Sequence, residues 1–223
     1  MERHLDIELK KLHKHILKMS ELARQAIAAS IEALTNRDNA QAQNVITADN
    51  KIDELELVVD EECIDLIACY QPMATDLRFI ATGMKINAEL ERIADLAVDI
   101  AQRVLELADK PLLKPLIDIP MLSDIAQKMV RDAIDSFVNK DIALAKQVVA
   151  SDTQADKLRN TICAELINDY MLRDAATANR AVPLLLIARH LERICDHATN
   201  IAEDIIYMVA GEIVKHHHGP QEK

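Results

Sequence analysis

Two pairs of acidic residues spaced four apart recur at matching places in both halves of this 223-residue chain. Carboxylate oxygens are the ligands that hard cations such as Mg²⁺, Ca²⁺, Mn²⁺ and iron prefer, whereas structural zinc sites usually include cysteine thiolates. Side chains four apart lie on one face of a helix, so the two members of a pair can act together. The spacing therefore predicts acidic cation sites. The pairs are Asp49 with Asp53, Glu91 with Asp95, Asp152 with Asp156, and Glu192 with Asp196.

The acidic pairs belong to an internal repeat. The segment LERIADLAVDIA at residues 90–101 returns as LERICDHATNIA at residues 191–202, an offset of 101, and the pair at 49 and 53 returns at an offset of 103. A repeat of this kind indicates one structural unit present twice. Packing alone does not require acidic residues, so a polar pattern kept in both copies indicates a function.

On a helical wheel the acidic residues of the repeated segment separate from its apolar residues. Glu91 and Asp95 lie roughly 140° to 220° from the centre of the apolar seam, so they are expected to face outward. Asp99 extends this stripe by one turn, and Asn200 replaces it in the second copy. Like charges at i, i+4 cost about 0.2–0.5 kcal/mol, so a merely solubilising face would gain from Lys or Arg there. The seam consists of Leu90, Ile93, Ala97 and Ile100, with copies Leu191, Ile194, Ala198 and Ile201.

The other acidic pairs lie at the edges of the seams of the preceding helices, where a side chain can lean toward a neighbour. Antiparallel packing of the next helix would then bring about four carboxylates together at the surface of each half. A buried di-iron site of the ferritin type needs Glu-x-x-His pairs, and no histidine here follows a glutamate by three. We therefore predict two surface metal sites. Their candidate ligands are Asp49, Asp53, Glu91, Asp95 and Asp99 in the first half, and Asp152, Asp156, Glu192, Asp196 and Asn200 in the second.

Histidines and arginines flank the acidic stripe. His197 follows Asp196 and is expected outside the ligand set, while His190 lies beside the apolar seam and is expected to be half-buried. Arg92 and Arg193 are expected to neutralise adjacent carboxylates through ion pairs, which contribute little when exposed.

Apolar periodicity and the scarcity of glycine and proline predict an all-α fold of six long helices. The polar break at residues 35–38 should cap the second helix. Pro72 suits the first position of the third helix, and Gly211 suits a C-terminal cap. The predicted helices span residues 5–34, 38–70, 72–108, 121–139, 141–172 and a last segment that ends near 211.

The repeat divides the chain into two tandem, pseudo-symmetric three-helix bundles, at residues 1–109 and 121–212. Three prolines at residues 110–120 exclude a continuous helix and predict the joint between them. Pro183 falls inside the sixth helix, so we expect a late start or a kink there. Residues 213–223 form a predicted flexible tail whose histidines, residues 216–218, could bind a transition metal.

Composition excludes several classes of function. The net charge of −11 disfavours nucleic acid and anionic lipid, and the 2% aromatic content provides no base-stacking platform. No apolar run is long enough to span a bilayer, so we expect a cytoplasmic protein without membrane insertion. Four cysteines without Cys-x-x-Cys spacing are expected to be buried thiols. Glycines are too dispersed for a phosphate-binding loop, and no nucleophile and base pattern is evident.

The chain resembles the PhoU family, the phosphate-transport accessory regulators of bacteria. The resemblance covers nearly the whole length and rests on MATDLRFI at residues 73–80, on the Glu91 and Asp95 motif, and on IARHLERICDHATNIAED at residues 187–204. Cys195 and Ala94 stand where the family usually has small residues such as glycine, and the change from Asp99 to Asn200 is a departure between the halves.

The resemblance implies two three-helix bundles with surface metal clusters held by Glu/Asp-x-x-x-Asp motifs. It further implies a negative regulator of phosphate uptake and of the phosphate-starvation response, the Pho regulon. Such a regulator couples the phosphate ABC transporter ATPase to the phosphate sensor histidine kinase, as a cytoplasmic homodimer that reaches the inner membrane through its partners. The expected metal is Mg, Mn or Fe, with Zn or Ca as alternatives.

Two other functions remain open at this point. One is a metal-dependent enzyme that acts at the carboxylate clusters, and the other is a plain helical scaffold whose acids only keep it soluble. A positioned general base beside the carboxylates would favour the enzyme. We expect a non-catalytic protein.

Overall fold

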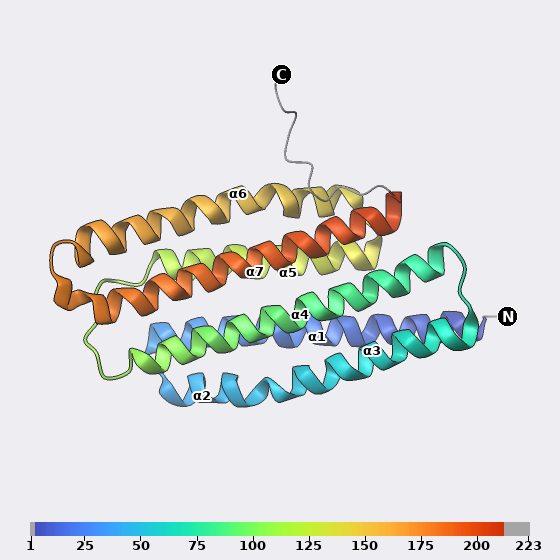
Figure 1. The fold of residues 1–223 in the computed structure, drawn as a ribbon, viewed down its shortest axis with the longest axis horizontal. Coiled ribbons are helices and arrows are strands. Elements are labelled where there is room, and N and C mark those ends of the chain that lie inside the picture. The colour runs from blue at the N-terminus through green and yellow to red at the C-terminus, as the bar shows by residue number, and fades with distance from the viewer. Residues whose placement is uncertain (1–2, 212–223) are drawn as a thin grey trace, which may run out of the picture.

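The computed structural model describes residues 3–211, and all of its regular elements are helical. Three antiparallel segments form each half, and the two halves lie side by side along their length (Figure 1). This confirms the predicted all-α architecture. The elements are α1 (His4–Asn36), α2 (Asn39–Ala48), α3 (Asn50–Tyr70), α4 (Thr75–Glu106), α5 (Asp118–Asn139), α6 (Ile142–Glu165), η1 (Leu166–Met171), η2 (Ala175–Thr177) and α7 (Ala178–Ala210).

The same turn joins the first two segments of each half. Arg37 ends α1 in the left-handed conformation with φ 58°, and the carboxylate of Asp38 accepts the backbone N–H of Gln41 at 2.9 Å. Lys140 (φ 52°) and Asp141 repeat this arrangement between α5 and α6. An aspartate N-cap satisfies one of the free N–H groups at a helix start. The predicted break at residues 35–38 is therefore confirmed, and it exists twice.

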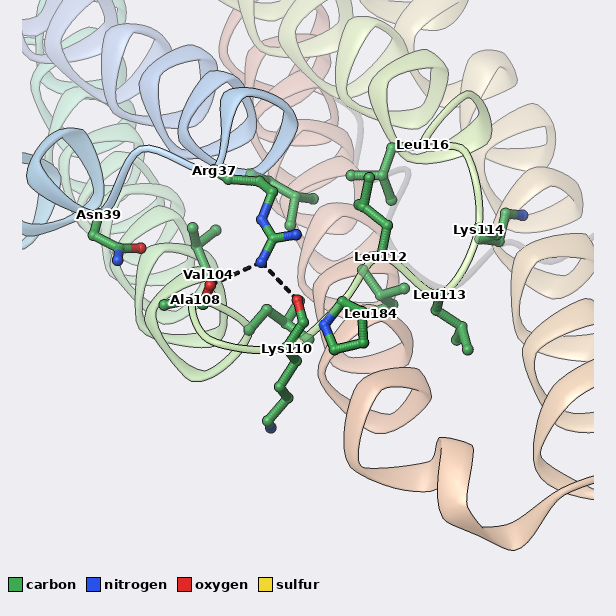
Figure 2. A pocket seen from close by; sticks show the side chains of 13 residues that line it. Arg37, Asn39, Val104, Ala108, Lys110, Leu112, Leu113, Lys114, Leu116 and Leu184 are labelled. Atoms are coloured by element: carbon green, nitrogen blue, oxygen red, sulfur yellow. Dashed lines mark hydrogen bonds between the residues drawn. The ribbon is translucent and has the colours of Figure 1, made fainter.

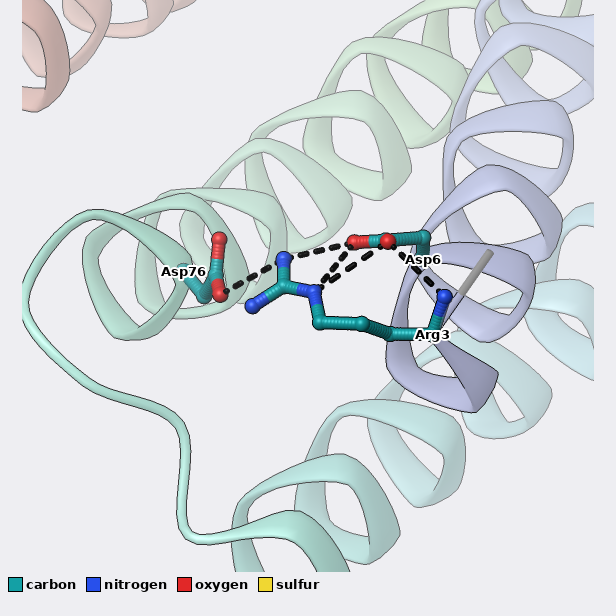
Figure 3. Close-up of polar contacts among 3 residues, drawn as sticks. All are labelled: Arg3, Asp6 and Asp76. Carbon is teal, nitrogen blue, oxygen red and sulfur yellow. Dashed lines mark hydrogen bonds and ion pairs between the residues drawn. The ribbon is translucent and has the colours of Figure 1, made fainter. Parts of the chain in front are cut away.

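Two helix boundaries differ from the sequence prediction. The segment predicted at residues 38–70 is interrupted at Asp49, between α2 and α3. Pro72 does not begin the third helix, because Gln71 ends α3 with φ 46° and the turn continues to Ala74 before α4 starts at Thr75. The first turn of α4 is tied to the chain start, since Arg3 contacts both Asp6 and Asp76 (Figure 3).

The core is aliphatic and lies on the predicted seams. Leu90, Ile93 and Ala97 are fully buried, as are Leu191 and Ile194 in the second copy. The halves meet chiefly where α4 packs on α7 and where α1 packs on α5. One contact across this boundary is aromatic: the rings of Phe79 and Phe137 stack with centroids 5.0 Å apart, and His13 meets Phe137 edge-on.

The joint between the halves is fastened by hydrogen bonds to backbone carbonyls. Arg37 donates to the carbonyls of Ala108 and Lys110, at 2.8 and 2.6 Å, at the rim of a small pocket (Figure 2). The ammonium of Lys110 donates to the carbonyl of Asn179 at 2.8 Å. That carbonyl would pair with the N–H four residues later, which Pro183 lacks.

Proline is accommodated near helix starts in the second half. α7 begins at Ala178, so Pro183 lies in its second turn, with Lys110 satisfying the freed carbonyl. α5 begins at Asp118, earlier than the predicted Met121, because Pro120 falls in the first turn, where no intrahelical N–H is required.

Gly211 ends α7 as predicted, with φ 73° and its N–H bonded to the carbonyl of Tyr207. In the described part of the chain, no helix is long and apolar enough to cross a membrane. The histidine tract at residues 216–218 lies outside the described residues.

Candidate acidic cation sites

The first acidic cluster forms where α4 passes the junction of α2 and α3. Asp49 lies at this junction and experiences the negative charges of Asp53 in α3 and Asp95 in α4. Burial, reinforced by these charges, raises the pKa of Asp49 to about 6. Burial and then the charge of Asp95 raise the pKa of Glu91 to about 7. The structure thus brings together the two pairs that the sequence places 42 residues apart.

Glu56 joins this cluster and was missed by the sequence prediction. Burial and the charges of Asp60, Asp53 and Asp95 raise its pKa. Asp60 has a partner in the buried Asn87, whose amide donates to it at 3.0 Å. The signal for Glu56 was available, because it lies two helical turns after Asp49 on nearly the same face. The prediction stopped at the i, i+4 pair.

The second cluster repeats the first between α6 and α7. Burial, followed by the charges of Asp196, Asp156 and Glu192, raises the pKa of Asp152 to about 6. Burial and the charges of Glu192 and Asp156 also raise the pKa of Asp196. The four predicted carboxylates of the second half therefore also converge.

The two clusters carry opposite charges at the position of Glu56. Arg159 lies 103 residues after Glu56 and so takes its place in the second half. Its guanidinium donates to Glu192 at 2.7 Å and contacts Asp156 at 3.5 Å. The second cluster therefore contains its own cation, whereas the equivalent position in the first cluster adds another carboxylate.

The first acidic residue of each stripe is less exposed than the wheel predicts. The side chains of Glu91 and Glu192 are 21% and 16% exposed, because α3 and α6 pack beside them. Asp95 and Asp196 are exposed, as predicted. The partial burial accounts for the large effect of desolvation on the pKa of Glu91.

The third position of each stripe lies against the opposite half. Asp99 approaches the ring of His190 in α7 at 3.7 Å, and the amide of Asn200 donates to Glu89 in α4 at 3.3 Å. These two contacts correspond to each other under the 101-residue repeat. Asp99 and Asn200 thus connect the halves, while the other candidate ligands gather in the clusters.

The flanking histidines contribute to the boundary between the halves. The ring of His197 pairs with Glu89 at 2.5 Å, and His190 is half-buried, with a pKa lowered chiefly by burial. Arg92 lies 3.8 Å from Glu91, consistent with the expected ion pair. Arg193 makes no ion pair with any residue in the range 3–211, contrary to the expectation.

The cysteines are free thiols in the structure. Cys63 and Cys195 are buried and Cys163 is half-buried, and burial raises the pKa of all three. Cys69 is exposed, so the prediction of burial is wrong there. A raised pKa keeps the thiol of Cys195, which lies beneath the second cluster, protonated at neutral pH in the metal-free protein.

The donor chemistry of the first cluster fits a hard cation. Its acidic side chains are all carboxylates, and burial together with their mutual repulsion raises the pKa of Asp49, Glu56 and Glu91. Among residues 3–211, no three His, Cys, Asp or Glu side chains already form a set of metal ligands. The carboxylates of the cluster outnumber its one nearby guanidinium, that of Arg92, and Asp53 and Asp95 are exposed.

The fold and the duplicated acidic clusters define a class of protein, an all-α double three-helix bundle. A family model described as PhoU domain matches the chain twice, at residues 16–104 and 119–205. The chain belongs to the PhoU family.

Individual relatives match over nearly the whole chain. The chain is 43% identical over 211 residues to the phosphate-specific transport system accessory protein PhoU homolog of Aquifex aeolicus, covering 95% of both. It is 35% identical to the homolog of Pseudomonas putida, covering 97% of this chain and 84% of that protein.

Solved structures of two relatives share the fold. The crystal structure of PhoU from Pseudomonas aeruginosa aligns with a TM-score of 0.90 at 35% identity, covering 94% of this chain and 100% of that one. The phosphate transport system regulatory protein PhoU from Streptococcus pneumoniae aligns with a TM-score of 0.88 at 26% identity, covering 95% and 99%.

Proposed function

We propose that this chain is a non-catalytic accessory protein of a phosphate transport system that represses phosphate uptake and the phosphate-starvation response. Relatives that match more than nine-tenths of the chain are named phosphate-specific transport system accessory proteins. In this role it couples the phosphate ABC transporter ATPase to the phosphate sensor histidine kinase, as a cytoplasmic homodimer.

Metal ions at the acidic clusters are part of this proposal. The observation that carries it is the convergence of five carboxylates in the first half, opposed there by the guanidinium of Arg92: Asp49, Asp53, Glu56, Glu91 and Asp95. A bound divalent or trivalent cation would neutralise them. The expected ion is Mg, Mn or Fe, with Zn or Ca as alternatives.

The second cluster is proposed as the weaker of the two cation sites. Its acids, Asp152, Asp156, Glu192 and Asp196, share the guanidinium of Arg159, which lowers their attraction for an added ion. A metal-bearing cluster at the bundle surface would leave coordination positions open to water or to a partner.

A non-catalytic role is consistent with the reactive side chains. The rings of His15 and His197 are paired with Glu62 and Glu89. Burial raises the pKa of the Cys163 thiol and disfavours the nucleophilic thiolate.

A reporter of the phosphate-starvation response tests the regulatory role. In cells that lack this chain the reporter should be active in phosphate-rich medium, and the wild-type chain should silence it. A reporter that stays silent without the chain contradicts the proposal. A pull-down should also recover the transporter ATPase and the sensor kinase, and recovery of neither under any phosphate condition contradicts the coupling.

Elemental analysis tests the metal sites. Protein purified without chelator should contain bound metal that is reduced in the combined variant Asp53→Ala, Glu91→Ala, Asp95→Ala. The matched control, Glu61→Ala with Asp65→Ala, removes exposed acids of α3 outside the cluster and should leave the metal content unchanged. Equal metal content in the wild type and the triple variant contradicts the site assignment.

A further inference from the structure

A hollow with a volume of about 510 Å³ lies between α6 and α7 on the second half. Its volume is within the range of small-molecule binding sites. Three guanidinium groups line it, together with two carboxylates. These five charged residues are Arg159, Arg189, Arg193, Glu192 and Asp196.

Two of the three arginines are unneutralised. The guanidinium of Arg159 donates a hydrogen bond to the carboxylate of Glu192 at 2.7 Å. Arg189 and Arg193 are exposed, and neither forms a hydrogen bond or an ion pair with any other residue in the described range 3–211. The wall of the hollow therefore carries an excess of one positive charge in a chain whose net charge is −11.

The corresponding face of the first half has the opposite charge. At the repeat offsets, Glu56 replaces Arg159, and Ala88 replaces Arg189. Of the three arginines, Arg193 alone has a basic counterpart there, Arg92. One copy of the duplicated surface thus concentrates carboxylates, while the other concentrates guanidinium groups around a hollow.

We propose that the hollow of the second half binds a phosphate group, either as inorganic phosphate or as the phosphate of a small monoester. Guanidinium groups present parallel N–H donors that match phosphate oxygens in a bidentate geometry. At neutral pH a phosphate group carries a charge between −1.5 and −2. Arg189 and Arg193 offer it two guanidinium charges, and the carboxylate of Asp196 in the same wall reduces the excess to one positive charge. The hollow is larger than inorganic phosphate, so it accommodates an ester substituent against the apolar side chain of Leu185.

Phosphate binding at the hollow goes beyond the regulatory function and does not rest on it. It can be measured on the purified chain without the transporter or the kinase. Titration calorimetry of the full chain with inorganic phosphate, in chelator to exclude phosphate held through a metal, should show saturable binding. The variant Arg189→Gln with Arg193→Gln should bind at least tenfold more weakly. Both side chains are exposed, so an unchanged thermal midpoint is expected and shows that the variant remains folded.

Two controls separate a site from general charge. Arg92→Gln removes the exposed counterpart of Arg193, and Arg173→Gln removes an exposed arginine paired with Asp169; both should bind phosphate like the wild type. A parallel titration with glycerol phosphate shows whether the hollow prefers inorganic phosphate or a phosphate monoester. Weaker binding of either ligand by the variant Arg189→Gln with Arg193→Gln supports the site. Absence of saturable binding of both ligands, or equal weakening in Arg92→Gln, overturns the proposal.

Discussion

Replacement of Glu91 by glutamine should stabilise the metal-free protein at pH 8. Burial and the charge of Asp95 raise the pKa of Glu91 from its ordinary value of 4.5 to about 7, and the side chain is 21% exposed. One pKa unit corresponds to about 1.4 kcal/mol, so the ionised carboxylate costs about 3 kcal/mol before screening. Screening by solvent and salt reduces this cost to about 1–2 kcal/mol, which Glu91→Gln should recover.

The effect should depend on pH with a defined sign. The folded state holds a proton on Glu91 up to about pH 7, whereas the unfolded chain releases it near pH 4.5. The wild type therefore loses stability as the pH rises through this window, and the advantage of Glu91→Gln should vanish near pH 5. Urea unfolding followed by circular dichroism, in chelator at pH 5 and pH 8, measures both free energies of unfolding.

The pseudo-symmetric residue provides the matched control. Glu192 has the same position in the second repeat, but its carboxylate accepts from Arg159 at 2.7 Å. Glu192→Gln should therefore destabilise the protein at pH 8, while Glu91→Gln stabilises it. The reasoning would be refuted if both variants changed the free energy of unfolding in the same direction. It would also be refuted if Glu91→Gln stabilised the protein equally at pH 5 and pH 8.

Three further predictions concern the repeat and its two sites. Asp38→Ala and Asp141→Ala each remove an N-cap hydrogen bond and should each lower the free energy of unfolding by about 1 kcal/mol. The two effects should add in the double variant. Destabilisation by only one of the two substitutions argues against equivalent caps. Phe137→Ala should cost about 3–5 kcal/mol in urea unfolding, since its ring is buried where α1, α4 and α5 meet; a loss under 1 kcal/mol would contradict that packing. Arg159→Glu should strengthen Mn²⁺ binding at the second cluster at least tenfold and Glu56→Arg should weaken it at the first, as measured by calorimetry; unchanged affinities would show that this position does not control cation binding.

Much of the fold followed from local sequence signals. The seam residues Leu90, Ile93 and Ala97 repeat at the helical period, and an aspartate directly after a left-handed residue caps the second helical segment of each half. The position of Pro72 was predicted incorrectly, because proline fits both a helix start and the turn before it. What decides between them is the left-handed Gln71, which the sequence does not mark with a glycine.

The candidate site was predictable to the level of one helix face. The wheel separates Glu91 from the seam, but the extent to which α3 covers that residue depends on how two helices pack, which no single helix encodes. The same limit applies to Asp99, which lies in line with Asp95 on the helix but meets His190 across the boundary between the halves. Glu56 and Arg159 were missed for a different reason, since the prediction rested on acidic pairs that the two repeats share and these two residues differ between the repeats.

The differences between the repeats carry as much functional information as their similarities. The shared seams and caps explain why both copies fold alike, and a stable bundle needs nothing more from them. Substitution of Arg159 for Glu56 reverses a charge at a half-buried position outside the apolar seam, where core packing imposes no such choice. Ala88 and Arg189 differ in the same direction, so the two changes together make the surface charge of the second copy more positive than that of the first. We therefore propose that divergence of the duplicated surface gives the chain two sites of different charge on one helical scaffold.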